Sequence, residues 1–101
     1  MTPQDTELLR ARLLGETARV QWSELLTFFA RGQLIRVDAK LDLIDIAAHI
    51  AGDDLHAIES LTATGKIAPL DDSTATDWQQ RQPVLWAVVL APWILVQERG
   101  H

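Results

Sequence analysis

The stretch "VLWAVVLAPWILV", residues 84–96, restricts the possible folds more than any other part of the chain, because it holds thirteen uncharged residues in a row. A membrane-spanning helix needs about 20 apolar residues. This stretch is shorter, and Pro92 would remove a helical hydrogen bond within it. Valine and isoleucine favour extended backbone. We therefore predict two strand segments, about 85–90 and 93–98, with a bend or bulge at Ala91-Pro92.

Both faces of this closing strand pair should be covered, because its residues do not alternate between polar and apolar. Helices of the same chain can cover one face. A second subunit is a natural cover for the other face, with Trp86, Pro92 and Trp93 as candidate dimer or core anchors. The rival explanation is that the first helix alone covers the second face. Of the two, the sequence favours a homodimer.

The composition is typical of one globular domain spanning residues 1–101, with 48% hydrophobic and 23% charged residues. The chain has no cysteine, which excludes disulfides and thiolate metal sites. The opening "MTPQDTELLR" lacks a basic segment followed by an apolar one, so we expect no signal peptide and a cytoplasmic location without membrane attachment.

Helix and strand signals divide the chain into an N-terminal helical pair, residues 1–32, and a core, residues 33–101. The first helix should begin at Thr2 and Pro3 and end at Gly15, and the second should bury Trp22 and end at Gly32. The core should begin with a strand at about 33–37, followed by a helix capped by Asp42. A second helix should be capped by Asp53 or Asp54, with Leu55, Ile58 and Leu61 facing inward. A strand at "KIAPL" and a short helix at about 75–82 should follow.

This order of elements resembles a winged helix-turn-helix. A small residue, Ala48, would lie where two helices touch, and Gly52 would supply a turn angle that other residues resist. Ile58 and Leu61 would face inward on the second helix. We therefore expect an α+β fold, a small winged-helix-like domain with four to five helices and a short, mostly antiparallel sheet.

The charge distribution argues against a nucleic-acid ligand. Residues 1–40 carry six Arg or Lys against five Asp or Glu, whereas residues 41–101 carry three against nine. Phosphate binding depends on clustered cations, but the expected recognition helix begins with carboxylates. Its candidate interaction surface is Asp53, Asp54, His56 and Glu59. A DNA-binding regulator would need Arg10, Arg12, Arg19, Arg31 and Arg36 to converge in three dimensions.

Catalytic and metal-binding chemistry finds little support in the sequence. His49, Asp53 and His56 are weak candidates for metal ligands, because Gly52 breaks the helix between the two histidines; terminal His101 could add a fourth. No serine lies in a glycine-flanked nucleophile elbow, and no glycine-rich phosphate loop occurs. We therefore predict no catalytic residues, no metal and no cofactor.

Four segments carry a resemblance to a known family: "WSELL…ARGQLIRV", "LDLIDIAAHIAGDD", "TGKIAPL" and "LAPWILVQE". Together they are similar to the small bacterial family of domain of unknown function 2288, over about Trp22 to Glu98. This chain departs from the family's usual residues at Thr27, Phe28, Leu61 and Ala91. The resemblance implies the fold boundaries and a bacterial cytosolic origin, and it implies no activity.

From the residues themselves we predict a non-catalytic protein–protein interaction or regulatory module. A DNA-binding winged-helix regulator is the second hypothesis, and a small metal-binding enzyme is the third.

Overall fold

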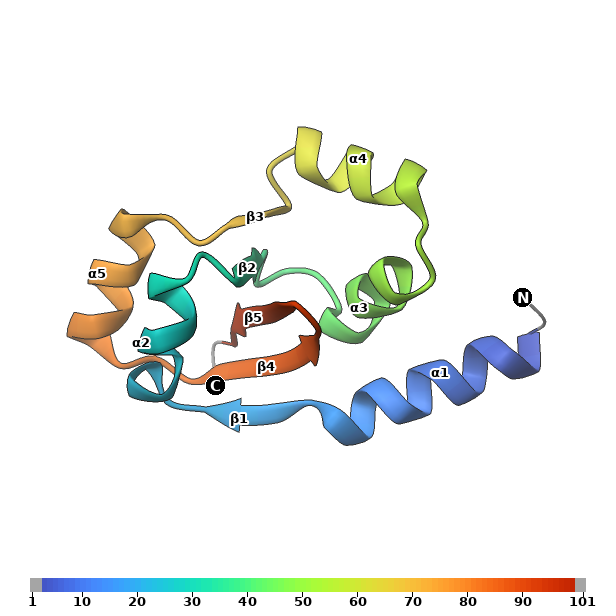
Figure 1. Ribbon diagram of the computed structural model, residues 1–101, viewed down its shortest axis with the longest axis horizontal. Helices are drawn as coiled ribbons and strands as arrows, with labels where there is room; N and C mark the ends of the chain where they lie inside the picture. The colour runs from blue at the N-terminus through green and yellow to red at the C-terminus, as the bar shows by residue number, and fades with distance from the viewer. Residues whose placement is uncertain (1–2, 100–101) are drawn as a thin grey trace.

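Five helices and five strands make up the computed structural model, which describes residues 3–99. Figure 1 shows their arrangement. The helices are α1 (Pro3–Glu16), α2 (Trp22–Ala30), α3 (Leu43–Ala51), α4 (Leu55–Ala63) and α5 (Asp72–Arg81). The strands are β1 (Ala18–Val20), β2 (Leu34–Val37), β3 (Ile67–Pro69), β4 (Leu85–Leu90) and β5 (Trp93–Glu98). The predicted α+β class is therefore confirmed. Thr2, the expected cap of the first helix, and His101 lie outside the described residues.

The strands form one mixed sheet in the order β1-β4-β5-β2-β3. The pair β2–β5 is parallel, and the other three neighbouring pairs are antiparallel. The sheet is thus mostly antiparallel, as predicted. Strand β1 was not expected. It lies between α1 and α2 in the chain and forms one edge of the sheet, so residues 1–32 are not simply a helical pair.

The closing stretch forms a β-hairpin whose strand limits agree with the prediction, and Ala91-Pro92 makes its turn. Successive side chains of a strand point to opposite faces of the sheet. Ile94 and Val96 accordingly belong to one buried cluster, whereas Val88 and Leu95 belong to another. This two-sided burial explains why the sequence there does not alternate between polar and apolar residues.

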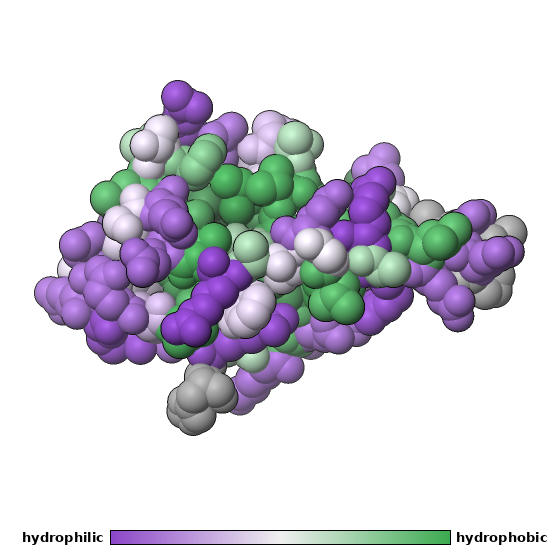
Figure 2. All heavy atoms as spheres, turned by 90° about the horizontal axis from the view of Figure 1, so that it is seen from below, coloured by the Kyte–Doolittle hydropathy of each residue, from purple (hydrophilic) through white to green (hydrophobic). Residues whose placement is uncertain are grey.

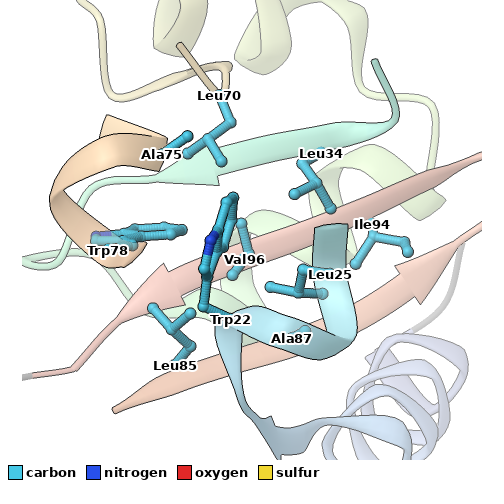
Figure 3. Close-up of a cluster of buried hydrophobic side chains, with 10 residues drawn as sticks. All are labelled: Trp22, Leu25, Leu34, Leu70, Ala75, Trp78, Leu85, Ala87, Ile94 and Val96. Carbon is cyan, nitrogen blue, oxygen red and sulfur yellow. The ribbon is translucent and has the colours of Figure 1, made fainter. Parts of the chain in front are cut away.

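Helices α2 and α5 cover the first face of the sheet. Trp22 of α2 and Trp78 of α5 lie edge to face with ring centroids 5.9 Å apart, among the buried side chains drawn in Figure 3. Both indoles are almost fully buried, which confirms the predicted core position of Trp22. An aromatic pair in this geometry contributes about 0.5–1.5 kcal/mol beyond the area that it buries.

Helix α5 is tied to the end of the hairpin by a polar network. The indole Nε1 of Trp78 donates to Oε1 of Glu98 at 3.0 Å, and Arg81 donates to both Glu98 and Asp77. The pKa of Asp77 is lowered by its hydrogen bond from Arg81. The short helix expected at about 75–82 is thus present as α5, and Asp71 caps it.

Helices α1 and α3 cover the second face. Leu13 of α1 and Leu43 and Ala47 of α3 are completely buried against it. The first helix therefore does not cover this face alone, because α3 shares the cover. The cover is incomplete near the hairpin turn, where Trp93 remains exposed on this face, and the homodimer stays a prediction.

The α3–α4 pair differs from the expected helix-turn-helix in two ways. Gly52 has φ −85°, an angle open to any residue, and it is Asp53 that adopts the left-handed φ of 56°. Leu55, predicted to face inward, is 64% exposed. Ala48, Ile58 and Leu61 are only half-buried, and α4 contains no buried residue. The winged-helix organisation is thus not confirmed.

No helix within residues 3–99 is long and apolar enough to cross a membrane.

Candidate functional site

The acidic turn between α3 and α4 contains one residue that caps a helix and one residue with a left-handed backbone conformation. Asp54 caps α4: its Oδ1 accepts a hydrogen bond from the backbone N–H of Ala57 at 3.2 Å, and its Oδ2 lies 3.1 Å from Nδ1 of His49. The Ala57 hydrogen bond, followed by His49, lowers the pKa of Asp54. Asp54 therefore stabilises the turn. Its neighbour Asp53 is exposed in the left-handed conformation.

The other two acidic-turn candidates, His56 and Glu59, are exposed on α4. Among the described residues, no group of three or more His, Cys, Asp or Glu side chains could hold a metal ion. His49 and Asp54 meet as a pair, without Asp53 or His56 completing a ligand set. The arrangement therefore joins two residues of the predicted cluster and serves helix capping.

The predicted anchors lie at different places on the hairpin. Trp93, Leu95 and Gln97 are alternate residues of β5 and therefore lie on one face of the sheet. Trp86 pairs with Gln97, so Trp86 and Trp93 share that face. They stand at opposite ends of the hairpin. Trp86 is half-buried, whereas Trp93 is 43% exposed and Pro92 is exposed in the turn beside it. Trp93 is thus a surface residue and Trp86 an inner one.

An apolar hollow of about 300 Å³ brings Trp93 and the acidic turn together. Helix α4 forms one wall and the sheet forms the floor, in keeping with the outward position of α4 in Figure 1. We call the rim and lining formed by Ile50, Asp53, Ile58, Pro69 and Trp93 the Trp93 surface. A second hollow lined by Trp93 is also lined by Ile50 and Asp53. Trp93, one of the predicted anchors, and Asp53, from the predicted acidic surface, are far apart in the sequence but therefore lie on one surface.

The five arginines required for a DNA-binding surface do not converge. Arg10 and Arg19 line one hollow, Arg12 lines another, and Arg31 and Arg36 line neither. Arg36 instead lies close enough to Asp71 to contribute to the lowered pKa of that carboxyl, after the hydrogen bonds from Thr74. Figure 2 shows the molecule from below, with hydrophobic side chains gathered toward the middle of this face and hydrophilic ones around them.

One group of residues that the sequence did not bring together is gathered beside Trp86, although two of its members, Arg10 and Arg19, were candidates for a DNA-binding surface. It consists of Arg10, Arg19, Lys40, Gln97 and Arg99. Arg19, Gln97 and Arg99 lie in β1, in β5 and just after β5, so only knowledge of which strands are neighbours brings them together. The single local signal was Gln97, a polar residue in an otherwise apolar strand.

These features define a small α+β domain in which a mixed five-stranded sheet lies between helices. The family model described as "Protein of unknown function (DUF2288)" matches residues 8–98, and the chain belongs to that family. The match confirms the resemblance seen in the sequence and extends it into α1.

The fold is shared with a solved relative. The NMR solution structure of PA1075 from Pseudomonas aeruginosa is 44% identical in sequence and superposes with a TM-score of 0.81. The alignment covers 100% of this chain and 94% of that chain. No curated protein matches the sequence.

Proposed function

We propose that this protein is a non-catalytic protein-interaction module of the bacterial cytosol, and that the Trp93 surface is where it contacts its partner. The observation that carries the proposal is the exposed indole of Trp93 beside an apolar hollow. Exposed aromatic residues next to a pocket are frequent energetic centres of protein interfaces. The non-catalytic part rests on the sequence, which places no serine in a nucleophile elbow.

The chemistry of this surface indicates the kind of protein segment that it fits. The hollow of about 300 Å³ has room for one or two apolar side chains, and its floor is built from Ile35, Ile67 and Leu95. Asp53 stands at the rim, and the exposed Glu59 lies on the neighbouring helix. Charge complementarity favours a partner with opposite charge around the contact. The partner segment should therefore carry a bulky apolar side chain flanked by Lys or Arg.

Affinity capture with matched variants tests this proposal. The tagged protein, Trp93→Ala and Leu26→Ala would each be used to capture proteins from native bacterial cytosol at low salt, with nuclease added. Leu26 is a suitable control because it is 46% exposed, close to the 43% of Trp93, and lies on α2 at the opposite face of the sheet.

We expect the wild type and Leu26→Ala to recover one protein in near-stoichiometric yield, and Trp93→Ala to lose most of it. Truncation of an interface hot spot costs about 2 kcal/mol or more, which corresponds to at least a tenfold weaker complex. Recovery that Trp93→Ala leaves unchanged would contradict the proposed surface. Recovery that nuclease abolishes would favour the DNA-binding regulator instead.

The predicted homodimer is a separate proposal, supported now by the exposed Val89 and Trp93 at the end of the hairpin. Light scattering after gel filtration at micromolar concentration tests it. A dimer should have twice the chain mass of 11.3 kDa, and a mass equal to the single chain would refute it.

A further inference from the structure

The group of cations beside Trp86 lines an open hollow of about 1080 Å³. Four of the nine Lys and Arg residues of the chain, Arg10, Arg19, Lys40 and Arg99, contribute to its wall. Among residues 3–99, Asp42 is the only acidic residue in that wall. Such a concentration of positive charge is notable because the whole chain has a net charge of −5.

Strand register places three of the wall residues in one row across the sheet. Arg19 of β1 pairs with Trp86 of β4, and Trp86 pairs in turn with Gln97 of β5. Residues directly opposite each other in antiparallel strands share a face. Arg99, two positions after Gln97, continues the same face along the direction of β5. The hollow is therefore built on the sheet itself, with α1 supplying Arg10 and the loop before α3 supplying Lys40.

Gln97 holds the wall in place. It is 1% exposed, and its Nε2 donates to the backbone carbonyls of Asp38 and Leu41 at 2.8 and 2.7 Å. Its Oε1 accepts a hydrogen bond from Nε of Arg99 at 3.2 Å. One buried amide thus positions both the loop that carries Lys40 and the guanidinium of Arg99. That guanidinium also lies over the ring of Trp86, 5.1 Å from the centroid.

Within the described part of the chain, three of the four cations have no acidic partner. Arg10 is paired with Asp45 and lies 3.9 Å from Asp42, so its charge is compensated. Arg19, Lys40 and Arg99 form no ion pair with any carboxylate in residues 3–99. Like charges held together without counter-charges raise the local positive potential and attract anions. Together these cations match a group with several negative charges better than a single carboxylate.

We propose that this hollow binds an organic phosphate. Its phosphate groups would lie among Arg19, Lys40 and Arg99, since the planar guanidinium fork fits phosphate oxygens in pairs. Its organic part would contact the half-buried Trp86 and the exposed Leu14 in the same wall. A concave hollow of this size suits a small molecule. The site lies at the opposite end of the hairpin from the Trp93 surface, so the two proposals are independent.

Isothermal titration calorimetry on the full chain tests the site with ATP, AMP, fructose 1,6-bisphosphate and inorganic pyrophosphate as probes. We expect at least one of the three organic phosphates to bind more tightly than pyrophosphate. Lys40→Gln and Arg99→Gln should each weaken that binding about tenfold or more, as expected for loss of a charged hydrogen bond. Both residues are exposed, and circular dichroism would verify that the variants remain folded.

Lys66→Gln and Arg31→Gln are matched controls, because each removes one exposed cation outside the hollow. Both should bind the probe as the wild type does, and so should Trp93→Ala, which separates this site from the proposed protein interface. Absence of binding by every organic phosphate at millimolar concentration would overturn the proposal. Equal weakening by the control variants, or tighter binding of a single-stranded oligonucleotide than of any probe, would also overturn it.

Discussion

Leu95 occupies the centre of the sheet. It pairs with Val88 on one side and with Ile35 on the other, and its side chain is completely buried. Val89 belongs to the same hairpin but is 60% exposed. The two residues therefore separate the contribution of core packing from that of strand formation, because both are apolar and lie in neighbouring strands.

We predict that Leu95→Ala lowers the free energy of unfolding by about 2–5 kcal/mol, since it removes buried methyl groups and leaves a cavity. Val89→Ala should change that free energy by no more than about 0.5 kcal/mol. Urea denaturation followed by tryptophan fluorescence measures both values. Similar losses in the two variants would contradict the difference in burial between Leu95 and Val89.

At the scale of single elements, the cap of α5 makes part of the stability dependent on pH. Oδ1 of Asp71 accepts a hydrogen bond from the backbone N–H of Thr74 at 2.8 Å, and the Thr74 contacts lower the pKa of Asp71 from its ordinary value of 3.8. A carboxyl whose pKa is lower in the folded state stabilises that state above its ordinary pKa. The contribution is lost as the pH falls through the lowered value.

We therefore predict that Asp71→Asn has a weaker dependence of stability on pH in the acidic range. Asparagine caps helices about as well as aspartate but does not titrate. Melting temperatures of the two proteins should be similar at neutral pH and diverge as the pH falls below about 4, where only the wild type loses its ionised cap. Circular dichroism melts across this range provide the test, and a constant difference at every pH would contradict the prediction.

Helices α3 and α4 have nine residues each but differ in packing. Four residues of α3 are buried, including Leu43 and Ala47, whereas none of α4 is. Segments with few buried contacts open more readily than the core. We predict that backbone amides of α4 exchange with deuterium faster than those of α3, as measured by NMR. Equal protection of the two helices would show that α4 packs more firmly than its exposure indicates.

At the scale of the whole molecule, the sequence predicted those features that depend on local patterns. The hairpin limits followed from a long apolar run interrupted at Ala91-Pro92, and the start of α3 followed from Asp42, which caps it as expected. Leu55 was misplaced because helical spacing shows which residues share a face but not whether a neighbour covers that face. Gly52 was misinterpreted because a glycine at a turn can still adopt an ordinary angle.

The candidate sites depend on long-range pairing and were only partly predictable. Trp93 and Asp53 were each identified as candidates, yet their meeting on one surface depends on the position of α4 above the sheet. The cationic hollow was missed because β1 was not predicted, and without β1 nothing places Arg19 opposite Trp86. Local propensity carries no information about which distant strands become neighbours.

The most direct test of the central claim is to map the contact surface by NMR. Isotope-labelled protein would be compared in buffer and in concentrated bacterial cytosol, with the backbone amides and the indole of Trp93 as reporters. We predict that signals of Ile50, Asp53, Ile58 and Trp93 shift or broaden, while those of Leu26 and Ala75 on the opposite face stay unchanged. Uniform broadening, or changes confined to the face of α2 and α5, would contradict a protein-interaction site at the Trp93 surface.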